Sequence, residues 1–262
     1  MADSAAKDDE GRVTAAVLVI GDEILSGRTA DTNINSIARF LGPYGVDLAE
    51  VRIVPDVHAE IVDAIRALKA RWDYLFTTGG IGPTHDDITA DAVAEALGTT
   101  LEEDAEVVDA MAARYGEPPN AARRRMARLP PGARKIRHPQ GGPPGFELHD
   151  VFVMAGVPGI MKGMLEDVGP RLRTGAVTHS ATLRVSGSGE GVIAAPLEAV
   201  AKAHPGMSLG SYPFFTPEGF GANLVVRGRD PREVARVVDE LAAALEGAGV
   251  PSPERVPEQK RP

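Results

Sequence analysis

One stretch of sequence decides the fold: Tyr74-Leu75-Phe76-Thr77-Thr78-Gly79-Gly80-Ile81-Gly82-Pro83-Thr84-His85-Asp86-Asp87-Ile88-Thr89. Its first residues favour a β-strand, a glycine-rich turn with two carboxylates follows, and an amphipathic helix begins where the stretch ends. The order strand, loop, helix is typical of an α/β protein with a parallel sheet.

The loop in this stretch has the composition of a phosphate site. Its three glycines let backbone N–H groups approach a ligand closely, and the start of the following helix favours an anion. Asp86 and Asp87 would repel that anion unless a divalent cation lay between them. The loop therefore indicates phosphate plus metal. The alternative is a tight turn in which Asp87 or Thr89 caps the helix.

The common nucleotide-binding motifs are absent here. The dinucleotide fingerprint G-x-G-x-x-G requires a glycine where this sequence has His85, and the pattern G-x-x-x-x-G-K-[ST] occurs nowhere. The sequence therefore predicts neither a Rossmann site nor a P-loop.

The composition is that of a globular protein without disulfides. The 262 residues are 43% hydrophobic and 25% charged, which suits one large domain or two modest ones. Because there is no cysteine, any metal must be held by oxygen or imidazole. The net charge of −9 argues against general nucleic-acid binding. Without a signal peptide or an apolar run of the ~18 residues that span a membrane, we expect a cytoplasmic protein that binds neither nucleic acid nor membrane.

Two further junctions repeat the pattern of a buried strand followed by a glycine turn. Val13–Ile20 precedes Gly21-Asp22-Glu23-Ile24-Leu25-Ser26-Gly27, and Val151–Met154 precedes Gly156-Val157-Pro158-Gly159 and a helix. In a parallel sheet such turns gather at the carboxyl edge of the strands, where ligands bind. We therefore expect three loops to form one site.

The other carboxylates near these turns have a simpler interpretation. Asp22 and Glu23 are also compatible with solvated loop charge. Asp56 follows a half-exposed strand at Ala49–Ile53 and would make a good N-cap for the next helix. The sequence leaves these alternatives open.

A basic segment lies between Glu117 and Glu147. It holds no acidic residue and seven cations, which are Arg123, Arg124, Arg125, Arg128, Arg134, Lys135 and Arg137. In an acidic chain such a segment forms a local field of one sign. It is either a solvated face or a region that attracts an anionic, phosphate-bearing ligand.

A change of composition near Pro170–Ser180 predicts a domain boundary. Beyond it the pattern reads β-α-β-β-α, and the last helix is capped by Asp230 and begins with Pro231. We expect a disordered tail at 1–11, an α/β domain at 12–175, a small α+β domain at 176–248 and a disordered tail at 249–262.

Five motifs in this order and spacing point to a family: Gly21-Asp22-Glu23-Ile24-Leu25, Asp31-Thr32-Asn33, Val54-Pro55-Asp56, Thr77–Thr89 and Gly156-Val157-Pro158-Gly159-Ile160-Met161. Over residues 13–172 the sequence resembles the molybdopterin-binding (MoaB/Mog-type) domain family, and most closely the N-terminal part of the competence/damage-inducible protein A (CinA) group. The second domain, with Gly210-Ser211-Tyr212-Pro213, resembles the region that follows in that group and in eukaryotic FAD synthases. The resemblance implies a three-layer α/β fold with a mostly parallel sheet, and a site for a pterin or nucleotide phosphate at the glycine loops.

The resemblance also implies site residues. In the Mog-type enzymes that adenylylate molybdopterin, carboxylates matching Asp56 and Asp87 act with a divalent metal, whereas the CinA group and FAD synthase are linked to hydrolysis of ADP-ribose or FAD. We therefore assign catalysis to Asp22, Asp56 and Asp87, and metal binding to Asp22, Asp56, Asp86 and Asp87. The expected substrate-binding residues are Gly21, Ser26, Thr78, Gly79, Gly80, Gly82, Thr84, Arg123, Arg124, Arg128, Gly156 and Pro158.

The sequence departs from these relatives in its loops and at its end. His138-Pro139 and Gly141-Gly142-Pro143-Pro144-Gly145 stand where relatives often have Asn-Pro and G-x-A-P-G, and Ala155 stands where a proline often precedes Gly-Val-Pro. The amidohydrolase domain usual in the CinA group has no counterpart in this sequence, so nicotinamide-nucleotide deamidation is not implied.

Taken with the site residues, the resemblance implies a metal-dependent nucleotide pyrophosphatase. It would cleave the phosphoanhydride of an ADP-ribose- or FAD-like compound with Mg²⁺, Mn²⁺ or Co²⁺. The alternatives are a non-catalytic module that binds molybdopterin or a nucleotide, and an enzyme that adenylylates molybdopterin. We also expect a homo-oligomer, either a dimer or a trimer.

Overall fold

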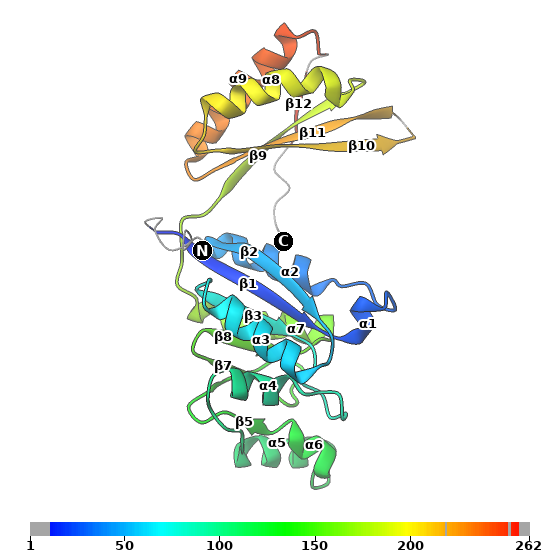
Figure 1. Ribbon diagram of the computed structural model, residues 1–262, viewed down its shortest axis with the longest axis vertical. Coiled ribbons are helices and arrows are strands. Elements are labelled where there is room, and N and C mark those ends of the chain that lie inside the picture. Colours follow the sequence, from blue (N-terminus) through cyan, green and yellow to red (C-terminus); the bar gives the residue numbers. More distant parts are fainter. Residues whose placement is uncertain (1–10, 218, 251–252, 257–262) are drawn as a thin grey trace. The chain divides into compact units, whose positions relative to one another are not determined.

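The computed structural model describes residues 11–217, 219–250 and 253–256. The chain divides into two compact units on either side of the bond between Ala176 and Val177 (Figure 1). Each unit has its own main sheet, and the first unit has a hydrophobic core on each face of its sheet, whereas the second unit has one core.

The first unit is built on a six-stranded sheet with the order β2-β1-β3-β8-β7-β6. In chain order its strands are β1 (Val13–Ile20), β2 (Val46–Val54), β3 (Tyr74–Thr78), β6 (Arg134–Ile136), β7 (Gly145–Leu148) and β8 (Val151–Met154). β2, β1, β3 and β8 run parallel, whereas β7 and β6 continue the sheet as antiparallel strands. A separate ribbon pairs β4 (Glu102–Glu103) with β5 (Arg128–Leu129). The predicted mostly parallel sheet is confirmed.

Helices cover both faces of this sheet (Figure 1). One face carries α3 (His58–Lys69), α4 (Thr89–Ala96) and α5 (Ala105–Tyr115), and the other carries α2 (Asn33–Leu41) and α7 (Pro158–Val168). Every residue of β1 is buried, because its alternate side chains enter the two cores in turn. Short helices α1 (Asp22–Leu25) and α6 (Ala121–Arg125) lie in connections, and 3₁₀ turns occupy Gly42–Tyr44 and Gly169–Arg171.

The carboxyl ends of the four parallel strands lie side by side. In the strand register Ile20 pairs with Val54, Val19 pairs with Thr78, and Thr78 pairs with Met154. The loops that follow these strands therefore leave the same edge of the sheet. This is the edge at which α/β proteins bind ligands.

The second unit is an antiparallel sheet with two helices. Its strands β9 (His179–Ser186), β10 (Ser208–Thr216), β11 (Gly219–Gly228) and β12 (Glu254–Val256) have the order β10-β11-β9-β12. Apolar side chains of α8 (Glu190–Ala203) and α9 (Pro231–Gly247) share a core with β9 and β11. Asp230 caps α9 by accepting a hydrogen bond from the Arg232 N–H at 2.8 Å. The predicted order β-α-β-β-α is present, with β12 added.

The predicted disordered tail at 249–262 is wrong for Glu254–Val256. These residues form β12, which pairs with Thr182–Arg184 of β9. The segment is too short to show a strand pattern in sequence, and it is held by pairing with a distant part of the chain. Residues 251–252 and 257–262 lie outside the described residues, as do residues 1–10 of the predicted N-terminal tail. No helix among the described residues is both long and apolar enough to cross a membrane.

Candidate ligand-binding cavity

A cavity of about 600 Å³ opens at the carboxyl edge of the first unit's sheet. One wall consists of the loops after β1, β2, β3 and β8. The other comes from the end of α5, the residue after α6 (Ala121–Arg125) and the segment after β6. The loop wall includes Gly21, Asp56, Gly79, Gly80, Gly82, Asp86, Asp87, Gly156 and Pro158, and the opposite wall includes Arg114, Tyr115, Met126, His138 and Gly141 to Pro143. Its volume lies within the ~300–1,000 Å³ typical of small-molecule sites.

The glycine loop after β3 can be built only with glycine at two positions. Gly79 has φ 105°, and a Cβ there would lie 2.1 Å from the carbonyl oxygen of Ile20. Gly80 has φ 67°, and a Cβ there would lie 2.2 Å from Thr89 Oγ1. That hydroxyl donates to the Gly79 carbonyl at 2.9 Å, and the Thr89 N–H donates to the Gly80 carbonyl at 3.0 Å. Thr89 thus ties the loop to the start of α4.

The same loop leaves three consecutive backbone donors without a partner. The N–H groups of Gly80, Ile81 and Gly82 donate to no other residue in the described part of the chain. Gly80, Ile81 and Gly82 all line the cavity. Successive free N–H groups at a concave surface form an anion-binding site.

Asp87 closes the turn that follows, and it does not cap α4. Its carboxylate accepts hydrogen bonds from the Thr84 N–H at 2.8 Å and from the Thr84 hydroxyl. The residue before α4 is Ile88, which makes no side-chain cap. The helix-cap interpretation of Asp87 is therefore wrong, and Thr89 instead lies inside the helix as its first residue.

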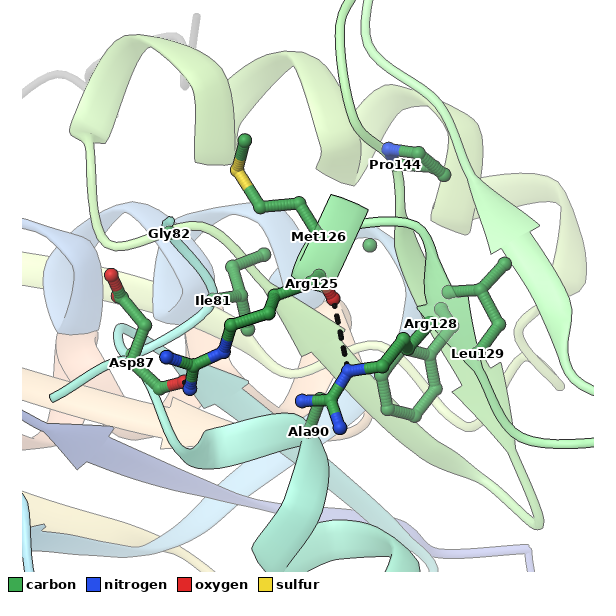
Figure 2. Close-up of a pocket in the computed structure, with 12 residues that line it drawn as sticks. Ile81, Gly82, Asp87, Ala90, Arg125, Met126, Arg128, Leu129 and Pro144 are labelled. Carbon is green, nitrogen blue, oxygen red and sulfur yellow. Dashed lines mark hydrogen bonds between the residues drawn. The ribbon is translucent and has the colours of Figure 1, made fainter. Parts of the chain in front are cut away.

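Arg125 holds this turn from outside. Its guanidinium donates to the carbonyl oxygens of Thr84 and Asp87, each at 3.1 Å. Figure 2 shows the guanidinium beside Asp87, at a hollow of about 20 Å³ next to the main cavity. The carbonyl of Arg125 in turn accepts from Arg128 Nε at 3.5 Å (Figure 2). Sequence reasoning counted Arg125 among the cations and missed this role, because only the fold brings α6 to the loop.

Asp56 joins the loop after β2 to the loop after β1. Its carboxylate accepts a hydrogen bond from the Asp22 N–H at 3.0 Å, and α3 begins after Val57 without a side-chain cap. The helix-cap interpretation of Asp56 is therefore wrong. Burial raises the pKa of Asp56, the bond from Asp22 opposes that shift, and the negative charges of Asp22, Glu23 and Asp86 add to it. The raised pKa of Asp56 therefore comes first from burial, with a further contribution from the neighbouring carboxylates.

The carboxylates do not form a complete metal site by themselves. Among residues 11–217, 219–250 and 253–256, no three His, Asp or Glu side chains lie close enough together to hold a metal ion. Hard divalent cations such as Mg²⁺ are commonly held by one or two carboxylates, with phosphate oxygens and water completing the shell. Asp56, Asp86 and Asp87, which line the cavity with excess negative charge, fit a cation bound in that way.

A buried amide connects the two glycine loops. Asn33, only 5% exposed, donates from Nδ2 to Thr78 Oγ1 at 2.8 Å and to the Gly156 carbonyl at 2.7 Å. The Thr78 hydroxyl donates to the Ala155 carbonyl at 2.9 Å. Thr78 is 1% exposed, so its hydroxyl is engaged within the protein and does not line the cavity.

The opposite wall was missed as a unit by sequence reasoning. Burial lowers the pKa of His138, and the positive charge of Arg114 lowers it further, which favours a neutral ring at pH 7. Arg114 is held by the Gln140 carbonyl at 2.6 Å. Tyr115 lies beneath the Arg123 guanidinium, 4.2 Å from its ring centroid. The only signal in the sequence is that His138 stands where relatives often have asparagine.

The prediction that the basic segment forms a local field of one sign is wrong, because carboxylates compensate most of its charge. Six of its seven cations meet carboxylates, most of them from elsewhere in the fold: Arg123 with Glu117, Arg124 with Glu103, Arg128 with Asp91, Arg134 with Glu147, Lys135 with Asp104 and Glu106, and Arg137 with Glu106. Arg123, Arg124 and Arg128 do not line the main cavity.

The fold brings most of the expected site residues to one cavity. Gly21, Asp56, Gly79, Gly80, Gly82, Asp86, Asp87, Gly156 and Pro158 line it. Those outside its lining are Asp22, Ser26, Thr78, Thr84, Arg123, Arg124 and Arg128. Asp22 and Thr84 lie one hydrogen bond away, on Asp56 and Asp87 respectively.

Comparison with known proteins matches each of the two units to a family model. Residues 16–174 match the family described as "Probable molybdopterin binding domain", and residues 178–254 match "FAD synthase, middle domain". A CinA-like protein of Citrifermentans bemidjiense is 43% identical over 193 residues, which cover 70% of this chain and 47% of the relative. A CinA-like protein of Myxococcus xanthus is 38% identical over 165 residues, covering 60% and 39%.

The crystal structure of the protein CinA with unknown function from Thermoplasma acidophilum is 32% identical, with a TM-score of 0.58, and the match covers 62% of this chain and 99% of that one. The chain spans less than half the length of the two CinA-like relatives above. The first of the two family matches takes in the whole cavity and more than half of the chain. The chain therefore belongs to the molybdopterin-binding domain family, and its relatives include CinA-like proteins.

Proposed function

We propose that the cavity binds a nucleotide with a phosphoanhydride, of the ADP-ribose or FAD type, and hydrolyses it with the help of a divalent cation. A volume of about 600 Å³ suits a molecule of this size. The opposite wall, with Tyr115 and a neutral His138, suits the planar heterocycle of such a ligand.

One observation carries this proposal: free backbone donors and carboxylates line the same cavity. The N–H groups of Gly80, Ile81 and Gly82 have no partner among the described residues, and Asp56, Asp86 and Asp87 lie in the same wall. Donors alone would suit any anion, and carboxylates alone would repel one. The combination suits a phosphate that arrives with a cation.

In this proposal the residues have separate tasks. The three N–H groups would hold phosphate oxygens, and Asp86 and Asp87 would hold the cation, which would supply neutralisation of charge on the phosphoanhydride. Asp56, whose pKa is raised, suits the acceptance of a proton from the attacking water. The water oxygen bonds to phosphorus as the anhydride P–O bond breaks, and ADP-ribose would yield AMP and ribose 5-phosphate.

A specific observation favours the second candidate, a non-catalytic module. No group of three possible metal ligands occurs among the described residues, so a cation would depend on the ligand for its retention. A site of this kind could bind a nucleotide or molybdopterin without catalysing any reaction. Adenylylation of molybdopterin would use the same donors and carboxylates, with ATP as the second substrate.

The test is a product assay with a metal panel. The protein is incubated with ADP-ribose or FAD and with Mg²⁺, Mn²⁺ or Co²⁺, and AMP is measured by chromatography. Metal-dependent AMP release supports the hydrolase. Tight binding without AMP under any of the metals supports the module, and the transfer of AMP from ATP to molybdopterin supports adenylylation.

A further inference from the structure

We infer that Asn33 is a positioning residue of this cavity: its buried amide sets the spacing between the glycine loop after β3 and the turn at Gly156. The inference rests on the proposed function, because it concerns the phosphate end of the same site. Asn33 is 5% exposed and is absent from the cavity lining, so it acts on a ligand only through the loops that it holds.

Asn33 bonds to both sides of the junction. One Nδ2 bond reaches Thr78, which immediately precedes the glycine loop, and the other reaches the Gly156 carbonyl at the start of the α7 turn. The Thr78 hydroxyl extends the link to the Ala155 carbonyl. One side chain near the start of α2 therefore connects two loops that are far apart in sequence.

The two loops approach each other closely at the point where Asn33 holds them. A Cβ at Gly156 would lie 3.1 Å from Gly79 Cα, so there is little space between the two backbones. Each loop presents free donors, since the N–H groups of Gly156 and Val157, like those of Gly80 to Gly82, have no partner in the described residues. Two sets of donors can hold one diphosphate only if their separation is maintained.

The Asn33 amide contributes less to stability than its two Nδ2 bonds alone would. Its Oδ1 is buried and has no hydrogen-bond partner among the described residues. An unsatisfied buried acceptor opposes folding, so it offsets part of what the two Nδ2 bonds contribute. The two Nδ2 bonds orient the loops, and the unpartnered Oδ1 reduces what Asn33 adds to the free energy of unfolding.

The test uses binding of inorganic pyrophosphate and of ADP-ribose with Mg²⁺, measured by isothermal titration calorimetry well below the melting temperature of each variant. Asn33→Ala should weaken both ligands about tenfold or more, because the separation of the donor sets is lost. Thr78→Val, which keeps the shape of the side chain but removes its hydroxyl, should act in the same direction, and Thr78→Ser should be close to wild type.

The double variant Asn33→Ala with Thr78→Val should lose less affinity than the two single variants together, because both substitutions break the same link. Asn120→Ala is the matched control. Asn120 caps α6 through a bond to the Arg123 N–H at 3.0 Å and does not line the cavity, so its loss should lower the melting temperature and leave the affinity unchanged.

The outcomes distinguish a failure of the proposed function from a failure of the positioning role of Asn33. If the wild type binds neither ligand, the proposed function fails. If the wild type binds and folded Asn33→Ala binds equally well, the positioning role is refuted. If Asn33→Ala does not fold, Thr78→Val carries the test: an unchanged affinity there refutes the link, and a loss that Thr78→Ser restores supports it.

Discussion

Replacing Asp87 with asparagine separates a carboxylate that holds a cation from one that only closes a turn. Asp87 accepts from the Thr84 N–H at 2.8 Å and from its hydroxyl, and the Oδ1 of asparagine can accept both bonds. Hydrogen bonds to charged groups contribute about 1.5–3 kcal/mol and neutral ones about 1 kcal/mol, so the change should cost about 1 kcal/mol at this partly exposed position. For a chain of this size that corresponds to a fall in Tm of about 2–4 °C.

The effect of Asp87→Asn on ligand binding should be much larger. A unit charge about 4 Å from a cation is worth about 4 kcal/mol at an effective dielectric constant of ~20, an upper limit at an open cavity. We therefore expect Mg²⁺-dependent affinity for ADP-ribose to fall at least about tenfold, where tenfold corresponds to 1.4 kcal/mol. Calorimetric titration with and without Mg²⁺ measures this loss.

Asp63→Asn is the matched control for Asp87→Asn. Asp63 is an exposed carboxylate in α3 that does not line the cavity, so the variant loses one charge without touching the site. It should keep both its Tm and its affinity. If folded Asp87→Asn also keeps its Mg²⁺-dependent affinity, Asp87 does not hold a cation, and the main reason for placing a metal at this loop is lost.

Three further substitutions test the cavity wall. Gly79→Ala should lower the free energy of unfolding by about 3 kcal/mol or more, since its Cβ would lie 2.1 Å from a β1 carbonyl oxygen, and a Tm near that of wild type would show that the loop has room for a side chain. Asp56→Asn should raise stability at neutral pH, because the raised pKa of Asp56 means that the folded state disfavours the charged carboxylate. The gain should be absent below the ordinary aspartate pKa of 3.8 and should grow as the pH rises through the folded pKa, and urea unfolding at neutral pH and at a pH below 3.8 measures it. The pair Arg124→Glu with Arg128→Glu should lower Tm by breaking two ion pairs. Because both arginines are paired and lie outside the lining of the main cavity, the affinity for ADP-ribose should stay close to that of the wild type, and a loss of affinity that grows as salt is lowered would assign ligand attraction to the basic segment after all.

The parallel half of the sheet could be predicted because its signals are local. β1, β3 and β8 are continuous apolar runs that are buried throughout, and each is followed by a glycine turn. The antiparallel extension was not predicted. β6 and β7 are short and lie beside a glycine- and proline-rich stretch, so their pairing depends on the rest of the sheet.

The loop wall of the site could be predicted for the same reason, and the opposite wall could not. Gly79 to Asp87 follow one strand without a break, so their glycines and carboxylates can be recognised from the sequence alone. His138 and Arg114 come together only when the segment after β6 packs beside the end of α5. The pairing of the basic segment was also hidden, because partners such as Asp91 and Glu103 lie outside the segment in sequence.

Cleavage of a phosphoanhydride is the central claim, and phosphorus NMR tests it most directly. ADP-ribose is followed over time with the protein and, in turn, Mg²⁺, Mn²⁺ and Co²⁺, the paramagnetic samples being freed of metal before each spectrum. We predict that the two diphosphate resonances disappear and that those of AMP and ribose 5-phosphate replace them, only when protein and metal are both present. Diphosphate resonances that keep their intensity with all three metals, in samples where calorimetry shows ADP-ribose to be bound, would contradict it.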